Sequence, residues 1–233
     1  MIGAAAALGV VGATALGAYY PNAWLFGRVI GRGPRTGRDL YLTFDDGPNP
    51  EATDRILETL AQQDVPAAFF MVGDHVRRFP EVARRVRDAG HEIGNHTDTH
   101  VKLYRRGPRR IRTELTDAHR TLVDRLGLTP RTFRAPHGYR NPFVGLSARR
   151  LGYETFGWSF GVWDTARPGA EKIRERTRRH LHPGAIILLH DGDGYDPVGD
   201  RRQTADALPG ILRDAHDHGY TFRPLAALLR NRS

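Results

Sequence analysis

The sequence contains no cysteine, and only two of its 233 residues are methionine. The missing cysteines exclude disulfide bridges, thiolate metal sites and a cysteine nucleophile, but they leave the cellular compartment open. Lysine is almost absent too, because Lys102 and Lys172 stand beside 33 arginines. There is neither a low-complexity tract nor a repeat of fixed period, so we do not expect a solenoid or a propeller.

The formal net charge of +9 raises the question of a polyanionic partner. The arginines, however, are spread along the chain in pairs such as Arg77-Arg78 and Arg178-Arg179, at spacings typical of helix surfaces. No aromatic residues interleave with them, as they do in a nucleic-acid stacking surface. We therefore expect no nucleic-acid partner and favour a basic face near an anionic membrane or wall polymer.

Residues 1–27 carry no charged side chain, and residues 1–20 are almost wholly apolar. About twenty apolar residues are enough to span a bilayer. The lack of basic residues before the apolar run argues against a cleaved signal peptide, although Ala15-Leu16-Gly17 offers a small-residue cleavage site. We predict an N-terminal hydrophobic helix within 1–27 that acts as a membrane anchor or signal-like segment.

A stretch rich in arginine and glycine follows, which predicts a basic linker at 28–38 and a folded domain at 39–230. By the positive-inside rule these arginines favour keeping the domain in the cytoplasm. We expect a membrane-anchored or secreted protein of the cell envelope, and the side of the membrane stays open. The alternatives for the apolar segment are a helix buried against the domain and a misplaced start codon that has removed a basic leader.

The length and a hydrophobic content of 39% suit one domain with a substantial core. Short β-branched and aromatic runs alternate with amphipathic stretches, which predicts an α/β fold with a parallel sheet covered by helices. We expect seven strands, which suit a nearly closed barrel, at 39–44, 67–72, 91–94, 132–135, 153–158, 185–190 and 221–224. We expect helices at 52–63, 80–89, 109–126, 142–151, 169–181 and 204–218.

In barrels of this kind the chemistry lies at the carboxyl ends of the strands. The first strand leads directly into Asp45 and Asp46, which are followed by Gly47, Pro48 and Asn49. A polar turn explains the last three residues but does not require a doubled aspartate. A metal ion would take one carboxylate as a ligand and leave the other free as a base.

Two histidines, His96 and His100, follow the third strand and are four residues apart. On one helical turn such a pair faces the same way, as in many divalent-metal sites. With Asp46 they supply three protein ligands and leave positions open for water, which is typical of a catalytic metal site.

Two more polar residues end strands. Arg134 should lie beside Asp45 if the barrel is correct, and His190 emerges from the apolar run 185–189, which is typical of a buried parallel strand. A surface arginine and a satisfied core histidine are the ordinary alternatives. The strand-end positions favour a function for both residues.

Together these segments resemble the polysaccharide deacetylase family, the NodB-homology carbohydrate esterases, over roughly residues 39–225. Five motifs stand in the family's order: Thr43-Phe44-Asp45-Asp46-Gly47-Pro48, His96-Thr97-Asp98-Thr99-His100, Arg134-Ala135-Pro136-His137-Gly138, Trp163-Asp164 and Leu188-Leu189-His190-Asp191. The resemblance implies a distorted (β/α)7 barrel of the NodB-homology type. It also implies a hydrolase that removes the N-acetyl group from an amino sugar.

By this resemblance Asp46, His96 and His100 bind a divalent metal, Asp45 is the general base, and Arg134 pairs with Asp45. Zinc suits such a site, while cobalt, nickel and manganese are also compatible with mixed nitrogen and oxygen ligands.

The resemblance further implies that His190 is the general acid and that Asp164 holds it in orientation and protonated. A backbone N–H near His137 is implied as a donor to the oxyanion. The other substrate contacts that we expect are Gly138, Leu188 and Tyr195.

Three positions depart from the family pattern. The family usually has an aromatic residue at His137, an aspartate at Gly161 and a tryptophan at Thr165. Trp163 or Trp158 is expected to wall the acetyl pocket instead. These departures bear on substrate preference, because the metal ligands, base and acid are all present.

The remaining histidines are predicted to have no catalytic role. His91 is expected to make a core contact at the start of the third strand. The others lie in or beside polar helical stretches and are expected at the surface: His75, His119, His180, His182, His216 and His218.

The leading functional hypothesis is an N-deacetylase, most simply a monomer, that acts on N-acetylglucosamine or N-acetylmuramic acid units of peptidoglycan or a chitin-like oligosaccharide. A second hypothesis is a deacylase of a lipid-linked amino sugar at the membrane, because the apolar segment and its trailing arginines would lie near anionic lipid. A third is a catalytically silent carbohydrate-binding protein. The intact set of acidic and histidine residues argues against the third.

Overall fold

The computed structural model describes residues 14–229. Its strands form one parallel sheet in the order β5-β4-β3-β2-β1-β7-β6, with β8 paired to β1. The strands are β1 (Asp39–Asp45), β2 (Ala67–Met71), β3 (Glu92–Asn95), β4 (Thr132–Phe133), β5 (Glu154–Thr155), β6 (Phe160–Gly161), β7 (Ile186–His190) and β8 (Thr221–Phe222). The prediction of an α/β fold with a parallel sheet is confirmed.

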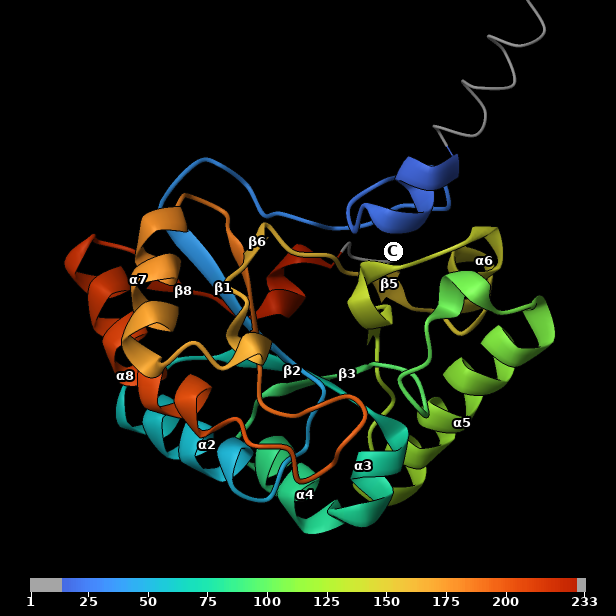
Figure 1. Ribbon diagram of the computed structural model, residues 1–233, viewed down its shortest axis with the longest axis horizontal. Helices are drawn as coiled ribbons and strands as arrows, with labels where there is room; N and C mark the ends of the chain where they lie inside the picture. Colours follow the sequence, from blue (N-terminus) through green and yellow to red (C-terminus); the bar gives the residue numbers. More distant parts are fainter. Residues whose placement is uncertain (1–13, 230–233) are drawn as a thin grey trace, which may run out of the picture.

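Helices surround the sheet on its outer side, from α7 and α8 round to α5 and α6 (Figure 1). They are α2 (Ala52–Gln62), α3 (Gly73–Arg78), α4 (Pro80–Asp88), α5 (Pro108–Leu126), α6 (Pro142–Arg150), α7 (Ala170–His180) and α8 (Arg202–Asp217). Helix α5 shows why the boundaries were predictable: Pro108 opens it, and Gly127 ends it with a left-handed φ of 64°.

Two elements were missed by the sequence prediction. Strand β6 has only two residues, Phe160 and Gly161, and the glycine breaks any alternating pattern. Helix α3 has six residues, which is too short for a helical period to be recognised. The predicted strands at 132–135, 153–158 and 221–224 are each reduced to two paired residues.

The main core lies between the sheet and the helices. Alternate side chains of β1 and β7 point into it, among them Leu42, Phe44, Ile187 and Leu189. The other face of the sheet is covered as well, because Tyr41 and Ile186 pack in a second cluster with Phe70 of β2. Burial on both faces explains why these strands are almost continuously apolar in sequence.

The chain before β1 crosses the open side of the curved sheet (Figure 1). Ile30 forms two backbone hydrogen bonds at the end of β5. The Ile30 N–H donates to the Thr155 carbonyl at 2.9 Å, and the Ile30 carbonyl accepts from the Gly157 N–H at 3.0 Å. Farther along, the Gly33 N–H donates to the Gly184 carbonyl at 2.8 Å, beside β7. Residues 30–33 therefore link the two sides of the sheet opening.

Residues 14–19 are helical, whereas residues 1–13 of the predicted hydrophobic segment lie outside the described part of the chain. Among the helices within residues 14–229, none combines the length and the apolar character that crossing a bilayer requires. The boundaries predicted at residues 27 and 38 stay predictions.

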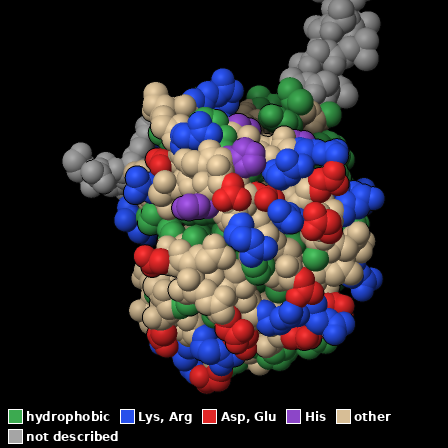
Figure 2. Space-filling model, turned by 90° about the vertical axis from the view of Figure 1, so that its left-hand side faces the viewer, with side chains coloured by type: hydrophobic (Ala, Val, Ile, Leu, Met, Phe, Trp, Pro, Cys, Tyr) green, Lys and Arg blue, Asp and Glu red, His purple; other side chains and the backbone are tan. Residues whose placement is uncertain are grey.

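Charged side chains of both signs are interspersed over the face formed by α7 and α8 (Figure 2). Arg174 of α7 and Asp214 of α8, for example, form an ion pair at 2.8 Å. This pair is partly buried, since the Asp214 side chain is only 9% exposed. Much of the high arginine content on this face is thus matched locally by acidic residues.

Candidate active site

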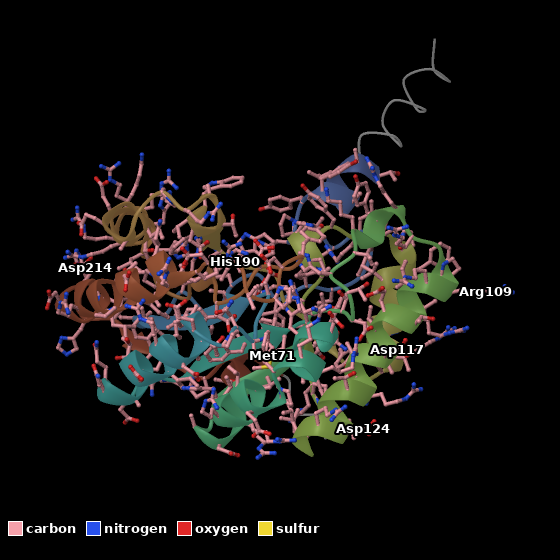
Figure 3. All side chains as sticks on the ribbon, turned by 60° about the horizontal axis from the view of Figure 1, so that its bottom comes forward. Met71, Arg109, Asp117, Asp124, His190 and Asp214 are labelled. Atoms are coloured by element: carbon pink, nitrogen blue, oxygen red, sulfur yellow. The ribbon has the colours of Figure 1, made fainter. Side chains whose placement is uncertain are left out.

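Parallel pairing in register brings four chain-distant polar residues to one edge of the sheet. Asp45 ends β1 directly opposite His190 at the end of β7. His96 follows β3, and Arg134 follows β4, which pairs with β3. In Figure 3, His190 lies near the middle of the molecule, between outer helices that carry Asp214 on one side and Arg109 on the other.

Asp46, His96 and His100 form a compact buried trio. The Asp46 Oδ1 atom lies 3.2 Å from His96 Nε2 and 3.0 Å from His100 Nε2. One ligand atom from each of the three residues can be chosen so that all lie within 4.8 Å of one another. The predicted ligands thus meet in space, in an arrangement that can hold a metal ion.

The hydrogen bonds around the trio fit a cation. His96 Nδ1 lies 2.9 Å from the Arg134 carbonyl, so we assign the proton to Nδ1 and a lone pair to Nε2. That lone pair faces Asp46 Oδ1, a buried oxygen that receives no hydrogen bond. Two buried lone pairs that face each other need a positive charge between them, and a ligating histidine with its other nitrogen bonded to a carbonyl is typical of metal sites.

Asp45 is held from behind by a fully buried arginine. Arg134 Nη1 donates to Asp45 Oδ1 at 2.6 Å and to Thr43 Oγ1 at 2.9 Å, and Nη2 donates to the Gly157 carbonyl at 2.8 Å. The guanidinium also lies 4.2 Å from the centre of the Phe70 ring. These contacts fix Oδ1 of Asp45 and leave Oδ2, which is 3.8 Å from His96 Nε2, directed at the trio.

His190 is oriented by a buried carboxylate. Asp164 Oδ1 lies 2.9 Å from His190 Nδ1, and its Oδ2 accepts hydrogen bonds from the His190 backbone N–H at 2.8 Å and from Thr204 at 3.0 Å. Burial opposes protonation of the imidazole, but the charge of Asp164 and this hydrogen bond raise the pKa of His190 to about 9. At neutral pH the ring is therefore protonated, with Nε2 available to donate a proton.

These groups open into one pocket of about 440 Å³. Its walls include Trp158 and Leu188, with His137 and Tyr195 on another side. The Tyr195 hydroxyl lies 3.0 Å from His137 Nε2, which ties the loop after β7 to the third motif. A pocket with apolar walls and a few convergent polar groups is the usual form of a small-molecule site.

The residues expected to contact substrate do not all line this pocket. Trp158 forms part of the wall, whereas Trp163 lies at the rim with 75% of its surface exposed. Gly138 is buried behind the wall, where it packs against Trp158 and Pro21. The departures at Gly161 and Thr165 both fall on the pocket lining.

Backbone strain is concentrated at the site. Within residues 14–229, seven non-glycine residues have a positive φ, and five of them belong to or border the site: Asp46, Thr97, His100, His137 and Trp163. Such conformations cost about 1 kcal/mol or more each and persist where the surrounding structure imposes them. The side chains of the trio are therefore preset by the fold.

Two functional neighbours were missed from the sequence. His75, predicted to be a surface residue, is buried, with Nδ1 2.9 Å from the Asp46 carbonyl. It lies within the short helix α3, four residues after β2 ends, so neither a strand-end position nor a helical period marked it in the sequence. Asp191 lies buried beneath the turn after Asp46, where a side chain on Gly47 would come within 2.1 Å of its Oδ2 atom.

The polysaccharide deacetylase family model matches residues 32–156. The chain is 38% identical over 200 residues to a chitooligosaccharide deacetylase of Bradyrhizobium sp. (strain ANU 289), covering 82% of this chain and 90% of that protein. The chain therefore belongs to the polysaccharide deacetylase family, and the prediction of an N-deacetylase-type hydrolase is confirmed.

Solved structures agree on the fold. A peptidoglycan N-acetylglucosamine deacetylase in complex with 4-naphthalen-1-yl-N-oxidanyl-benzamide superimposes with a TM-score of 0.81 at 28% identity, over 86% of this chain and 92% of that chain. This match confirms the distorted (β/α)7 barrel. A family 4 carbohydrate esterase pseudoenzyme from Bacillus anthracis also matches, with a TM-score of 0.78 at 29% identity over 86% of this chain and 68% of that chain.

Proposed function

We propose that this protein hydrolyses the N-acetyl group of an amino sugar in a metal-dependent reaction. The observation that carries the proposal is the convergence of three separately supported units on one pocket. They are the Asp46, His96 and His100 trio, the Asp45 carboxylate backed by Arg134, and the His190 imidazole backed by Asp164.

The residues have complementary tasks. A divalent cation held by the trio, with zinc the expected ion, would polarise the acetyl carbonyl and acidify the attacking water. Asp45, with Oδ2 free, accepts the proton of that water as its oxygen bonds to the acetyl carbon. The backbone N–H near His137 stabilises the negative oxygen that develops. His190 Nε2 then protonates the sugar nitrogen as the C–N bond breaks, and acetate and the free amine leave.

The substrate class rests on the relatives. One relative is named a chitooligosaccharide deacetylase, and a structural neighbour is named a peptidoglycan N-acetylglucosamine deacetylase. We therefore propose N-acetylglucosamine or N-acetylmuramic acid units, in peptidoglycan or in a chitin-like oligosaccharide, as substrate. This substrate would place the protein at the cell envelope.

A lipid-linked amino sugar is the second candidate, and it is favoured by a group of exposed apolar side chains. Within residues 14–229, large exposed hydrophobic residues gather in the N-terminal segment: Leu16, Tyr19, Tyr20, Trp24 and Leu25. They directly follow the uncharged apolar residues 1–13 of the sequence. Aromatic side chains of this kind favour the interface between membrane and water, so this segment supports the proposed membrane anchor.

The direct test of the proposed function is acetate release by the full chain. We expect metal-dependent release from N-acetylglucosamine oligomers or from peptidoglycan, measured enzymatically after addition of zinc, cobalt, nickel or manganese. A parallel assay with a polyprenyl-linked N-acetyl sugar separates the second candidate from the first.

The pseudoenzyme neighbour makes the negative outcome informative. If no acetate is released from any of these substrates with any metal, while oligosaccharides still bind, the protein is a silent binder and the hydrolase proposal is wrong. Retention of all seven residues in the three units argues for the active alternative.

The pH dependence tests the role of His190. Because the pKa of His190 is raised to about 9, its acidic form is present below that pH and is lost above it, so activity should fall on the alkaline side. In an Asp164→Asn variant the charge that raises this pKa is gone, whereas the opposing effect of burial remains. We expect the alkaline limb of kcat/KM to move to lower pH, with a loss of about tenfold or more at pH 8.

Asp200→Asn is the matched control for this experiment. Asp200 is a carboxylate in the loop before α8, and Arg202 holds its pKa down to about 2 through hydrogen bonds and charge. Its removal should leave the pH profile unchanged. An Asp164→Asn profile that superimposes on that of the parent would rule out the assignment of His190 as the acid.

A further inference from the structure

Three tyrosine rings from distant parts of the chain meet beside the catalytic pocket. The ring centroids of Tyr19 and Tyr104 are 5.1 Å apart, and each lies 5.3 Å from that of Tyr139. Tyr139 itself lines the pocket, with its ring 5.4 Å from that of His137. The tyrosine cluster is therefore continuous with the pocket and extends it toward the N-terminal segment.

The cluster is not closed off as a core would be. Tyr19 is 50% exposed, and the rings meet at angles of 59°, 78° and 79°, so they contact largely edge to face. An exposed group of aromatic rings with hydroxyl ends combines apolar faces with hydrogen-bonding tips. This combination matches a sugar ring, which has apolar C–H faces and hydroxyl groups at its edge.

A buried arginine holds the N-terminal part of this cluster in place. The Arg140 guanidinium donates to the carbonyls of Pro21, at 3.4 Å, and of Ala23, and the Arg140 backbone N–H donates to the Ala18 carbonyl at 3.0 Å. Within residues 14–229, no carboxylate forms an ion pair with Arg140. Because burying a cation without such a partner is costly, these carbonyls are what compensates its charge.

The same residues also contact the wall of the catalytic pocket. The Asn22 side chain donates to the Trp158 carbonyl at 2.8 Å. Pro21 packs so closely on Gly138 that a side chain there would come within 2.7 Å of Pro21 and of Trp158. We name residues 18–24 the N-terminal brace, since they are bonded to Arg140 and support both Trp158 and the third motif.

We propose that the N-terminal brace completes a second sugar-binding site, in which Tyr19, Tyr104 and Tyr139 receive the sugar unit next to the one that is deacetylated. The site deepens the proposed function and rests on it for the nature of the ligand. It makes the enzyme one that prefers oligomers to single sugars. Residues 18–24 then have two roles: they form part of the substrate site, and they join the folded domain to the apolar N-terminal residues.

The experiment compares Tyr19→Ala with the parent in the full chain. The substrates are a tetramer of N-acetylglucosamine and a small aryl acetate that fills only the catalytic pocket. We expect kcat/KM for the tetramer to fall about five- to tenfold, mainly through KM, with the aryl acetate unchanged. Tyr19→Phe, which retains the ring, should restore most of the loss.

Leu16→Ala is the control, because Leu16 is a large exposed apolar residue of the same segment, at 62%, and lies outside the brace. It should leave both substrates unchanged. Arg140→Met tests the brace itself and should give the same rise in KM for the tetramer together with faster proteolysis within residues 18–24. An unchanged ratio of tetramer to aryl acetate activity in Tyr19→Ala overturns the second sugar site.

Binding without catalysis separates this proposal from the proposed function. In the Asp45→Asn background, calorimetry should show weaker binding of the tetramer when Tyr19→Ala is added. If the parent releases no acetate and this difference in binding is still found, the second sugar site stands and the deacetylase function fails. If the tetramer binds equally with and without Tyr19→Ala, the second sugar site is wrong whatever the activity.

Discussion

Asp45→Asn should reduce acetate release by at least about 10³-fold, because the neutral amide cannot accept the proton of the attacking water. The same change removes the only carboxylate that pairs with Arg134 among the described residues, and Arg134 is fully buried. We therefore also expect a loss of about 3 kcal/mol in the free energy of unfolding, measured with urea. The metal content of the variant should equal that of the parent, since Asp45 is outside the trio.

Asp54→Asn is the control for the loss of an aspartate–arginine pair. Asp54 of α2 pairs with Arg85 of α4 at 2.7 Å on the surface. Breaking an exposed pair of this kind costs at most about 1 kcal/mol and should leave activity intact. If Asp45→Asn retains activity within tenfold of the parent, Asp45 is not the base.

Asp46→Asn should abolish both metal binding and activity. The carboxylate oxygen that faces His96 and His100 is the only anionic donor of the trio, so we expect metal affinity and acetate release each to fall by at least about 10³-fold. Metal content after dialysis measures the first quantity directly. A chelator should lower the thermal stability of the parent and leave that of the variant unchanged, because only the parent is stabilised by a bound ion.

Asp193→Asn supplies the comparison for this result. Asp193 also lines the pocket, but its carboxylate is bonded to Arg201 at 2.7 Å and to the backbone of its own loop. It should retain one equivalent of metal. Equal metal content in Asp46→Asn and the parent would show that the trio is not the metal site.

The sequence alone was sufficient for the residues that end strands. The strands β1 and β7 are buried on both faces, and such strands are continuously apolar, so Asp45 and His190 stand out where the apolar run stops. Parallel pairing then places such residues at one edge. Asp46 and His96 could be selected in the same way, because they follow β1 and β3. The expected helical turn that joins His96 to His100 is wrong, because residues 96–100 form an irregular loop in which Thr97 and His100 have positive φ.

Local pattern also explains the helices that were predicted to within two residues at each end. Helices such as α5 and α8 repeat an apolar stripe over several turns. The six-residue helix α3 and the two-residue strand β6 have no such repeat, and their conformation is set by the neighbours on which they pack. His75 was missed for this reason.

The sequence by itself determined the parallel α/β architecture, the strand-end residues and the set of groups that can do chemistry, because each leaves a periodic or adjacent pattern in the chain. Only the tertiary structure decided which residues line the pocket and which lie behind it. Gly138 lies behind the pocket because Trp158 and Pro21, the latter over a hundred residues earlier in the chain, pack against it. Contacts between residues so far apart leave no local signal, and the partners of Arg140 could be known only once the chain had folded.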